Sequence, residues 1–277
     1  EETEEQRYPT YMGGSNSIPS YLLHTLKPGT EALSPENILV FACSVVTGAP
    51  LSGVNRYTIG AKSPLTGGFA ETEAGGYWAP ELKFAGFDAV IVRGRAAKPV
   101  FLWIKDGAVE IRDAAGLWGL DNWQTLEQLE TELEDKRIRV VSIGPAGERL
   151  VRYACVQNDL EHYNGRTGMG AVMGSKNLKA IAVRGTQKLQ MADPEKVKEI
   201  GRWHNERIKT HPPNVGLTKF GTTGLVKGIN DGGFLPTRNF KEGVFEGADK
   251  LSAPAYHETI FHSNSTCWAC AVRCKRR

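Results

Sequence analysis

Three cysteines lie within eight residues near the end of the sequence, as Cys267-x-x-Cys270-x-x-x-Cys274. Thiolates are soft anionic ligands, and three this close together can surround one metal centre. Spacings of two and three residues between cysteines are typical of four-iron clusters, which take a fourth thiolate from elsewhere. Zinc is the alternative, but a zinc site usually brings a second ligand pair after a longer gap, and no Cys or His follows Cys274. The spacing favours an iron–sulfur cluster over a zinc site.

The two remaining cysteines, Cys43 and Cys155, lie far from this group and from each other. Secreted disulfide frameworks usually spread an even number of cysteines along a short chain, so this clustered, odd set argues against one. Both residues lie in apolar runs, Ile38–Cys43 and Val151–Val156, which have the character of strands. We therefore expect both thiols to be buried and unreactive rather than cluster ligands.

The same glycine-rich pattern occurs twice in the sequence, at residues 75–94 and at residues 165–185. Each reads as a glycine-rich turn, a short helix and a strand that ends in Val-Arg-Gly. A duplicated unit of this kind would pack as a two-fold pair with two similar loop-to-helix junctions. The unpaired N–H groups and positive dipole end of each helix suit an anion, and glycine lets a phosphate approach the backbone. The repeat predicts two phosphate-like sites, with purely structural turns as the alternative. Neither stretch matches the P-loop or the dinucleotide fingerprint.

Strands are expected to dominate the chain before about residue 186. Asp106-Gly107 predicts a hairpin turn between two of them, and the charged start Glu1–Arg7 is expected to be frayed. Runs rich in β-branched and aromatic residues predict strands at Ile38–Cys43, Tyr57–Ala61, Ala89–Arg93, Val100–Ile104, Val109–Ile111, Arg139–Ile143 and Ala180–Arg184.

Helices are expected to dominate after residue 186. Within the strand-rich part, Asp121 with Gln124 predicts the capped start of one helix. Asp193-Pro194 predicts the start of another that runs towards Lys209, with proline in its first turn. We therefore expect two domains, residues 1–186 and residues 187–277.

The bulk composition excludes several classes of protein. The 277 residues carry a formal charge of +3 with the basic residues scattered, which gives no support to nucleic-acid binding as the main task. With 40% hydrophobic residues, the sequence contains no apolar run of about eighteen residues and no signal-peptide pattern. We expect a cytoplasmic protein without a membrane span.

Five longer strings make the sequence resemble the aldehyde ferredoxin oxidoreductase family. The resemblance runs from about Tyr11 to Cys274 and implies an α+β fold: a duplicated, β-rich pterin-binding domain with pseudo-two-fold symmetry, followed by a mainly helical segment. It also implies one tungsten or molybdenum atom held by two pterins, and a 4Fe-4S cluster bound by a Cys-x-x-Cys-x-x-x-Cys motif. The strings are Leu33–Asn37, Ala61–Gly67, Glu81–Gly86, Ser142–Glu148 and Gly170–Leu178.

The resemblance also implies cofactor-binding residues. Arg56 matches the family arginine between a pterin and the cluster, a role that suits its five-donor head. Glu73-Ala74-Gly75 falls where the family often has Asn-Ser-Gly, and Arg166-Thr167-Gly168 falls where it often has Arg-Gly-Gly. A carboxylate at Glu73 departs from that pattern, because it suits a pterin nitrogen or a Mg²⁺ that bridges the pterin phosphates rather than a phosphate. The segment Gly13–Ser17 departs from the usual Gly-Gly-Arg-Gly.

The function implied is oxidation of an aldehyde to a carboxylic acid in an anaerobic setting. Electrons would pass through the cluster to ferredoxin or another iron–sulfur subunit. The alternatives are a tungsten-dependent aromatic acyl-CoA (benzoyl-CoA) reductase subunit, and a non-enzymatic iron–sulfur or zinc module. In the family the catalytic acid and base lie beyond Cys274, so no catalytic residue is assigned and His162 is interpreted as a structural loop histidine. The chain is expected to be a piece of a longer, oligomeric protein.

Overall fold

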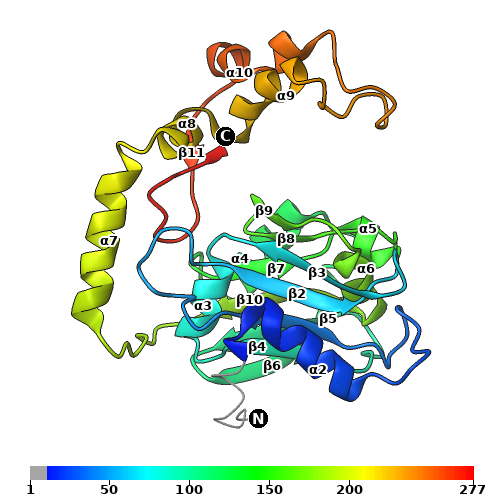
Figure 1. Cartoon of the computed structure of the whole chain (residues 1–277). Helices are drawn as coiled ribbons and strands as arrows, with labels where there is room; N and C mark the ends of the chain where they lie inside the picture. The colour runs from blue at the N-terminus through cyan, green and yellow to red at the C-terminus, as the bar shows by residue number, and fades with distance from the viewer. Residues whose placement is uncertain (1–10) are drawn as a thin grey trace. The chain divides into compact units, whose positions relative to one another are not determined.

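A computed structural model describes residues 11–277, so the charged start Glu1–Arg7 lies outside the described residues. The chain divides into two units (Figure 1). The first contains the chain up to Ala49 together with Val54–Ala192, and the second contains Pro50–Gly53 together with Asp193–Arg277. The short segment Pro50–Gly53 thus belongs with the C-terminal part of the chain, although it lies between two strands of the first unit in sequence.

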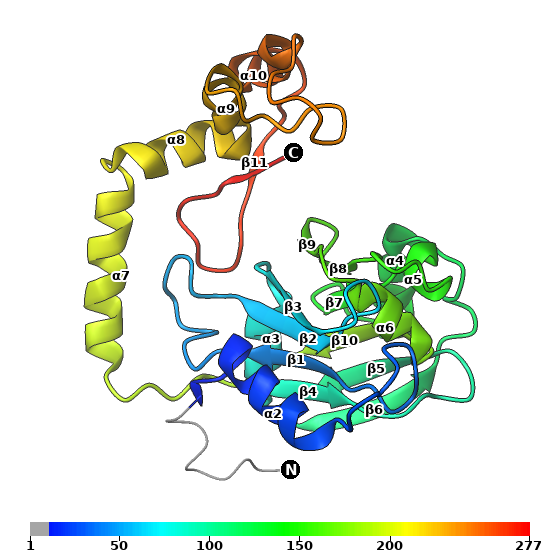
Figure 2. The same cartoon turned by 45° about the vertical axis from the view of Figure 1, so that its right-hand side comes forward.

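The first sheet of the first unit has four strands, all paired antiparallel in the order β3-β2-β1-β4 (Figure 2). After β3 the chain passes through helix α3 and returns as β4 beside β1. The elements are β1 (Leu39–Cys43), β2 (Tyr57–Lys62), β3 (Phe69–Ala74), α3 (Trp78–Phe84) and β4 (Ala89–Val92).

The second sheet has six strands in the order β6-β5-β10-β7-β8-β9. Only the pair β10 and β5 is parallel. Its elements are β5 (Val100–Lys105), β6 (Ala108–Asp113), α4 (Asn122–Glu132), β7 (Arg139–Ser142), α5 (Pro145–Glu148), β8 (Val156–Asn158), β9 (His162–Asn164), α6 (Met169–Ser175) and β10 (Leu178–Arg184).

The two sheets contain the same folding unit twice. The succession β1-β2-β3-α3-β4 and the succession β7-β8-β9-α6-β10 both form three antiparallel neighbours, then a helix, then a strand that returns antiparallel to the first. The glycine-rich stretches at residues 75–94 and 165–185 form the second part of each unit, as a turn, a helix and a strand. The structural repeat is therefore longer than the sequence repeat. The first three strands of the two halves have the same topology, although their sequences are not similar.

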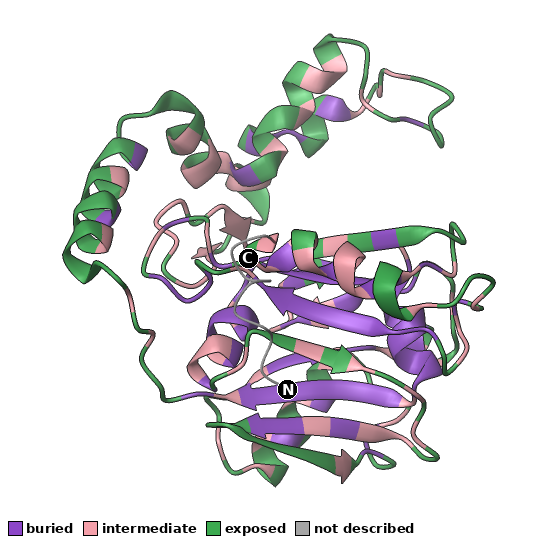
Figure 3. Ribbon diagram, turned by 60° about the horizontal axis from the view of Figure 1, so that its bottom comes forward, coloured by how far each residue is buried: buried purple, intermediate pink, exposed green. Residues whose placement is uncertain are grey.

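The core of this unit lies between the sheets and includes both repeat helices. Helix α3 packs against β10 and β7 of the other sheet, while α6 packs against β1 and β2. Every residue of α6 is buried, and Trp78 of α3 is fully buried with its indole N–H donated to the Ile181 carbonyl at 3.1 Å. Figure 3 shows the buried strands as the purple centre of the sheets. Each half thus completes the hydrophobic core of the other.

The outer face of the first sheet is covered by η1 (Gly14–Asn16) and α2 (Ser17–Thr25). Ile18 and Leu22 of α2 pack on Ile38, Val40 and Ala42, which point away from the main core because side chains alternate along a strand. This packing places the segment Gly13–Ser17 against the strands of the candidate site.

The predicted strands and helices are confirmed apart from one strand. Asp106 and Gly107 both have positive φ, at 44° and 91°, as a tight two-residue hairpin requires. Asp121 and Gln124 form a reciprocal capping box at the start of α4. The strand expected at Val151–Val156 is wrong, because residues 151–155 form an irregular segment with one turn and only Val156 begins β8.

The second unit consists mainly of short helices, as expected. Among the described residues, no helix is both long and apolar enough to cross a membrane. One two-stranded ribbon, of β11 paired antiparallel with β12, closes the cysteine segment. The elements are α7 (Pro194–Ile208), α8 (Pro212–Phe220), η2 (Gly221–Leu225), α9 (Val226–Asp231), η3 (Ala248–Leu251), α10 (Ala253–Thr259), β11 (Asn264–Ser265) and β12 (Lys275–Arg276).

Candidate cofactor site and cysteine loop

Arg56 and Glu73 form an ion pair at one end of the first sheet. Arg56 directly precedes β2 and Glu73 is the penultimate residue of β3, and the register pairs Glu73 with Thr58. Arg56 Nε donates to Glu73 Oε1, with the two side chains 50% and 46% exposed. The sequence predicted each of these residues as a cofactor-binding residue but predicted no contact between them, and the structure shows that they are paired.

The loop that leads to Arg56 is fixed by buried polar contacts. Asn55 is 2% exposed, accepts the Gly48 N–H at 2.7 Å and donates to the Ala49 carbonyl at 3.1 Å. Thr47 Oγ1 donates to the carbonyl of Arg56 itself at 2.9 Å. These bonds fix the backbone of Arg56. The position of its Cα and Cβ atoms is therefore defined, although its guanidinium is exposed.

A cavity of about 280 Å³ lies beside this ion pair. Its lining combines Arg56 and Glu73 with the segment Gly13–Asn16, where Ser15 Oγ lies 3.1 Å from Thr58 Oγ1. Gly13 has a φ of 72°, and a Cβ there would lie 2.5 Å from the Cys43 carbonyl oxygen, so only glycine fits. Hydroxyl, guanidinium and carboxylate groups around one cavity suit a heterocycle with N–H and C=O edges.

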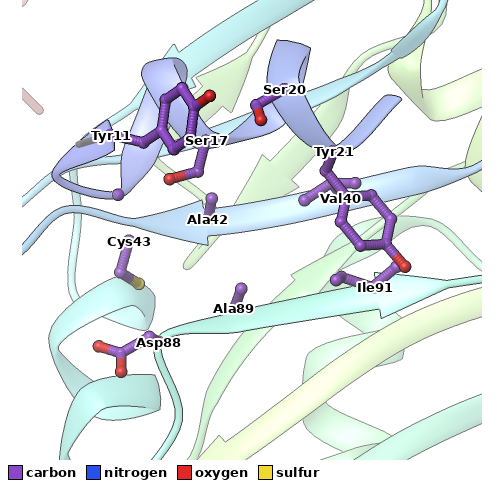
Figure 4. Close-up of a pocket in the computed structure, with 11 residues that line it drawn as sticks. Tyr11, Ser17, Ser20, Tyr21, Val40, Ala42, Cys43, Asp88, Ala89 and Ile91 are labelled. Carbon is purple, nitrogen blue, oxygen red and sulfur yellow. The ribbon is translucent and has the colours of Figure 1, made fainter. Parts of the chain in front are cut away.

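A second cavity of about 120 Å³ shares Gly13 and Ala42 with the first (Figure 4). It lies between α2 and the strands β1 and β4, and most of its lining is apolar. Cys43 is 2% exposed, so the expectation of a buried thiol is confirmed there, and burial raises the pKa of this thiol to about 12. Cys155 is only half-buried, in the turn before β8, and burial also raises its pKa.

The first glycine loop is closed by two residues of the other repeat. Asn158 Nδ2 donates to the Gly75 carbonyl at 2.7 Å, and a Cβ on Gly76 would lie 2.7 Å from that nitrogen. Asp159 Oδ2 accepts the Tyr77 N–H at 3.2 Å, at the N-cap of α3. A carboxylate of the protein itself thus accepts the N–H of the N-cap residue of this helix. Burial raises the pKa of Asp159 to about 6, against the opposing charge of Arg139.

The second glycine loop contains the predicted residues Arg166, Thr167 and Gly168. Gly168 has a φ of 79°, and a Cβ there would lie 2.0 Å from the Arg152 carbonyl oxygen. The Thr167 carbonyl accepts a hydrogen bond of 2.7 Å from Ser63 Oγ, whose residue directly follows β2. Arg166 is exposed and forms no ion pair with any other of residues 11–277. Its guanidinium is therefore available to an anionic ligand.

The two loops are closed reciprocally and follow two neighbouring strands. The last residue of β8, Asn158, and the next residue, Asp159, bind the first loop. Ser63, which follows β2, binds the second. Strands β3 and β9 lie side by side, because Asn164 donates to the Thr72 carbonyl at 2.9 Å and accepts from the Tyr57 hydroxyl at 2.6 Å. Consequently the two loops begin at the ends of neighbouring strands, with Glu73–Gly75 at the end of β3 and Arg166–Gly168 just after β9.

Two lysines in the second repeat are structural. Lys176 is buried, and its ammonium donates to the carbonyls of Asn37 at 2.6 Å and Gly94 at 3.0 Å. Burial, followed by the nearby charge of Arg95, lowers its pKa to about 8. Lys179 is paired with Glu148 in the interior. Neither ammonium is directed at a phosphate.

His162 departs from its expected place. It lies in strand β9 and is 3% exposed, so it is not the loop histidine that the sequence suggested. The three-residue strand is too short and too polar to be recognised from its sequence pattern.

The three clustered cysteines lie on one hairpin loop, Thr266–Cys274, which we call the cysteine loop. The pairing of β11 with β12 closes it, and all three cysteines are half-buried and form no disulfide. Among residues 11–277, no three His, Cys, Asp or Glu side chains are close enough to hold a single metal ion. A four-iron cluster binds each thiolate to a different iron, so it does not need the sulfurs to converge on one atom. The donor chemistry and the single loop fit such a cluster.

Comparisons with known sequences identify the chain. The sequence model of the aldehyde ferredoxin oxidoreductase N-terminal domain matches residues 1–185, and that of domains 2 and 3 matches residues 199–277. The tungsten-containing aldehyde ferredoxin oxidoreductase of Pyrococcus abyssi is 45% identical over 100% of this chain and 46% of its own length. An aliphatic sulfonate oxidoreductase, WOR-like subunit, of Pyrococcus furiosus is 36% identical over 62% of this chain and 29% of its own. The chain spans about half the length of the tungsten-containing relatives it matches.

A solved structure has the same fold. The active site complex BamBC of benzoyl coenzyme A reductase, in complex with 1,5-dienoyl-CoA, superposes with a TM-score of 0.85 at 33% identity. The superposition covers 99% of this chain and 44% of that one. It confirms the expected α+β fold, in which a β-rich part precedes a helical one. The chain belongs to the aldehyde ferredoxin oxidoreductase family.

Proposed function

We propose that this chain is the cofactor-binding part of an enzyme that oxidises aldehydes to carboxylic acids at a tungsten bis-pterin centre. Electrons leave through a 4Fe-4S cluster to ferredoxin. The observation that carries the proposal is the reciprocal repeat, because it places two similar glycine loops at the ends of adjacent strands. One metal held by two pterins needs two related cradles that face one place. Because the chain belongs to an enzyme family, the alternative of a non-enzymatic iron–sulfur or zinc module has no support.

The residues present fit such a cofactor. The polar cavity beside Arg56 and Glu73 suits the edge of one pterin, and the ion pair fixes the guanidinium plane. Arg166 is free to bind a phosphate of the second pterin, with Thr167 and Gly168 forming the turn below it. The Glu73 carboxylate would suit a Mg²⁺ that bridges the pterin phosphates.

The overall change is aldehyde plus water to carboxylate, three protons and two electrons. When bound, the metal centre supplies the two-electron oxidation and the cluster supplies one-electron transfer. The first unit would orient the cofactor through Arg56 and the two loops. Cys267, Cys270 and Cys274 of the second unit would hold three of the irons.

A second candidate is reduction of an aromatic acyl-CoA thioester. The fold match to a benzoyl coenzyme A reductase complex favours keeping it, as do the unusual Gly13–Ser17 segment and the carboxylate at Glu73. Both reactions would use the same cofactor site, so the substrate alone separates them.

The test is metal analysis of the native holoprotein, followed by two assays. Tungsten near one per chain with about four irons, and aldehyde-dependent reduction of ferredoxin, are expected. Reduction of benzoyl-CoA without aldehyde oxidation would support the second candidate. Zinc in place of tungsten and iron would refute both. Molybdenum in place of tungsten would keep the mechanism and correct the metal.

A further inference from the structure

One buried hydroxyl ties the cysteine loop to the segment Pro50–Gly53. Ser52 is 7% exposed, and its Oγ accepts the Ala271 N–H at 2.9 Å. The same oxygen lies 3.4 Å from the Ala269 carbonyl oxygen and 3.3 Å from Asn205 Oδ1, so its single proton can be donated to either. Ala269 and Ala271 are the two neighbours of Cys270. Ser52 therefore holds the backbone on both sides of the central cysteine.

The backbone of this loop needs such support. Ala269 and Arg273, which directly precede Cys270 and Cys274, both have a φ of 52°, in the left-handed region that side-chain-bearing residues rarely adopt. Each turn directs the following cysteine. A conformation of this kind persists only where neighbouring contacts fix it.

Two further hydroxyls hold the rest of the loop. Thr266 Oγ1 lies 2.7 Å from the Cys270 carbonyl oxygen and 3.1 Å from that of Cys267. Thr218 Oγ1 donates to the Val272 carbonyl at 2.9 Å. Ser52 differs from both because it accepts an N–H as well as lying near a carbonyl, and because its two partners are 217 and 219 residues away in sequence.

We infer that Ser52 is a positioning residue for Cys270 in the metal centre of the cysteine loop. The inference rests on the proposed iron–sulfur cluster. Ser52 does not touch the metal. It fixes the direction of the Cys270 thiolate before iron binds, so the loop loses less conformational entropy when the cluster assembles. Residues that orient metal ligands in this way commonly change metal retention about tenfold when they are replaced.

The test compares Ser52→Ala with Ser52→Thr in the anaerobically purified holoprotein. The readouts are iron content and the rate at which an iron chelator removes the cluster, together with the EPR spectrum of the reduced protein. Ser52→Ala is expected to lose iron about tenfold faster than wild type and to change the EPR spectrum. Ser52→Thr keeps the hydroxyl and is expected to restore both properties.

Ser252→Ala is the matched control. Ser252 is also 7% exposed, lies in the same unit and donates a hydrogen bond to a backbone carbonyl, that of Asp249, at 2.6 Å. Its loss should leave the rate of iron release unchanged. Equal release from Ser52→Ala and wild type, or equally accelerated release from Ser252→Ala, would overturn the positioning role alone. Wild-type protein that binds no iron would overturn the proposed cluster, and this inference with it.

Discussion

Replacement of Gly168 by alanine should destabilise the second glycine loop more than any nearby change of equal size. Alanine at a φ of 79° costs about 1 kcal/mol relative to glycine. The new Cβ would lie 2.0 Å from the Arg152 carbonyl oxygen and 3.0 Å from Pro64 Cγ. Relief of such overpacking costs about 1–3 kcal/mol. We therefore expect the free energy of unfolding to fall by about 2–4 kcal/mol, or the melting temperature by about 10 °C.

Gly165 provides the control, in the same loop. A Cβ there would meet no atom within 4 Å and its φ is not positive, so Gly165→Ala should change stability by less than about 0.5 kcal/mol. Thermal unfolding of both variants, followed by circular dichroism, measures the difference. Tungsten content should fall only in Gly168→Ala, because displacement of its backbone also moves Arg166. Equal melting temperatures for the two variants would refute the steric argument.

Three further predictions concern charge and metal binding. Glu73→Gln should lower turnover about tenfold, because it removes the charge-assisted bond to Arg56, and should change stability by less than about 1 kcal/mol. Glu71→Gln, on the same strand, should change neither turnover nor stability. The Asp159 pKa of about 6 lies above its unfolded value, so the free energy of unfolding should fall by about 2 kcal/mol as pH rises from 4 to 6. Urea titrations of wild type and Asp159→Asn check this, and the same slope in both would contradict it. Cys270→Ser should lose most iron while Cys155→Ser keeps it; equal iron in the two variants would exclude Cys270 as a ligand.

The parts of the fold that the sequence predicted correctly are those with local signals. Strands such as β1 and β10 consist of apolar, β-branched runs, and Asp106-Gly107 and Asp121 mark a turn and a helix start by their chemistry alone. Strands β8 and β9 have three residues each and are largely polar, so they carry no period. The matching topology of the two halves was therefore only partly visible, in the glycine loops.

The candidate site was predictable in its residues but not in their contacts. Arg56 and Glu73 were marked by resemblance, yet their pairing depends on the register of β2 and β3. The carboxylate of Asp159 at the start of α3 comes from a residue 82 positions away. Likewise, nothing in the local sequence of Ser52 indicates that its partners are 217 and 219 residues further along. Long-range hydrogen bonds of this kind leave no local pattern.

The reciprocal closure of the glycine loops has a consequence for the order of folding. The bonds from Asn158 to Gly75 and from Ser63 to Thr167 close loops of 83 and 104 residues. Contacts this distant in sequence form late, since their entropy cost must be met by structure already present. Each half can assemble its own sheet first, but neither can finish its own loop. Competence to take up a cofactor should therefore arise in one late step, so that a newly made chain passes from unable to able to bind without a half-competent stage.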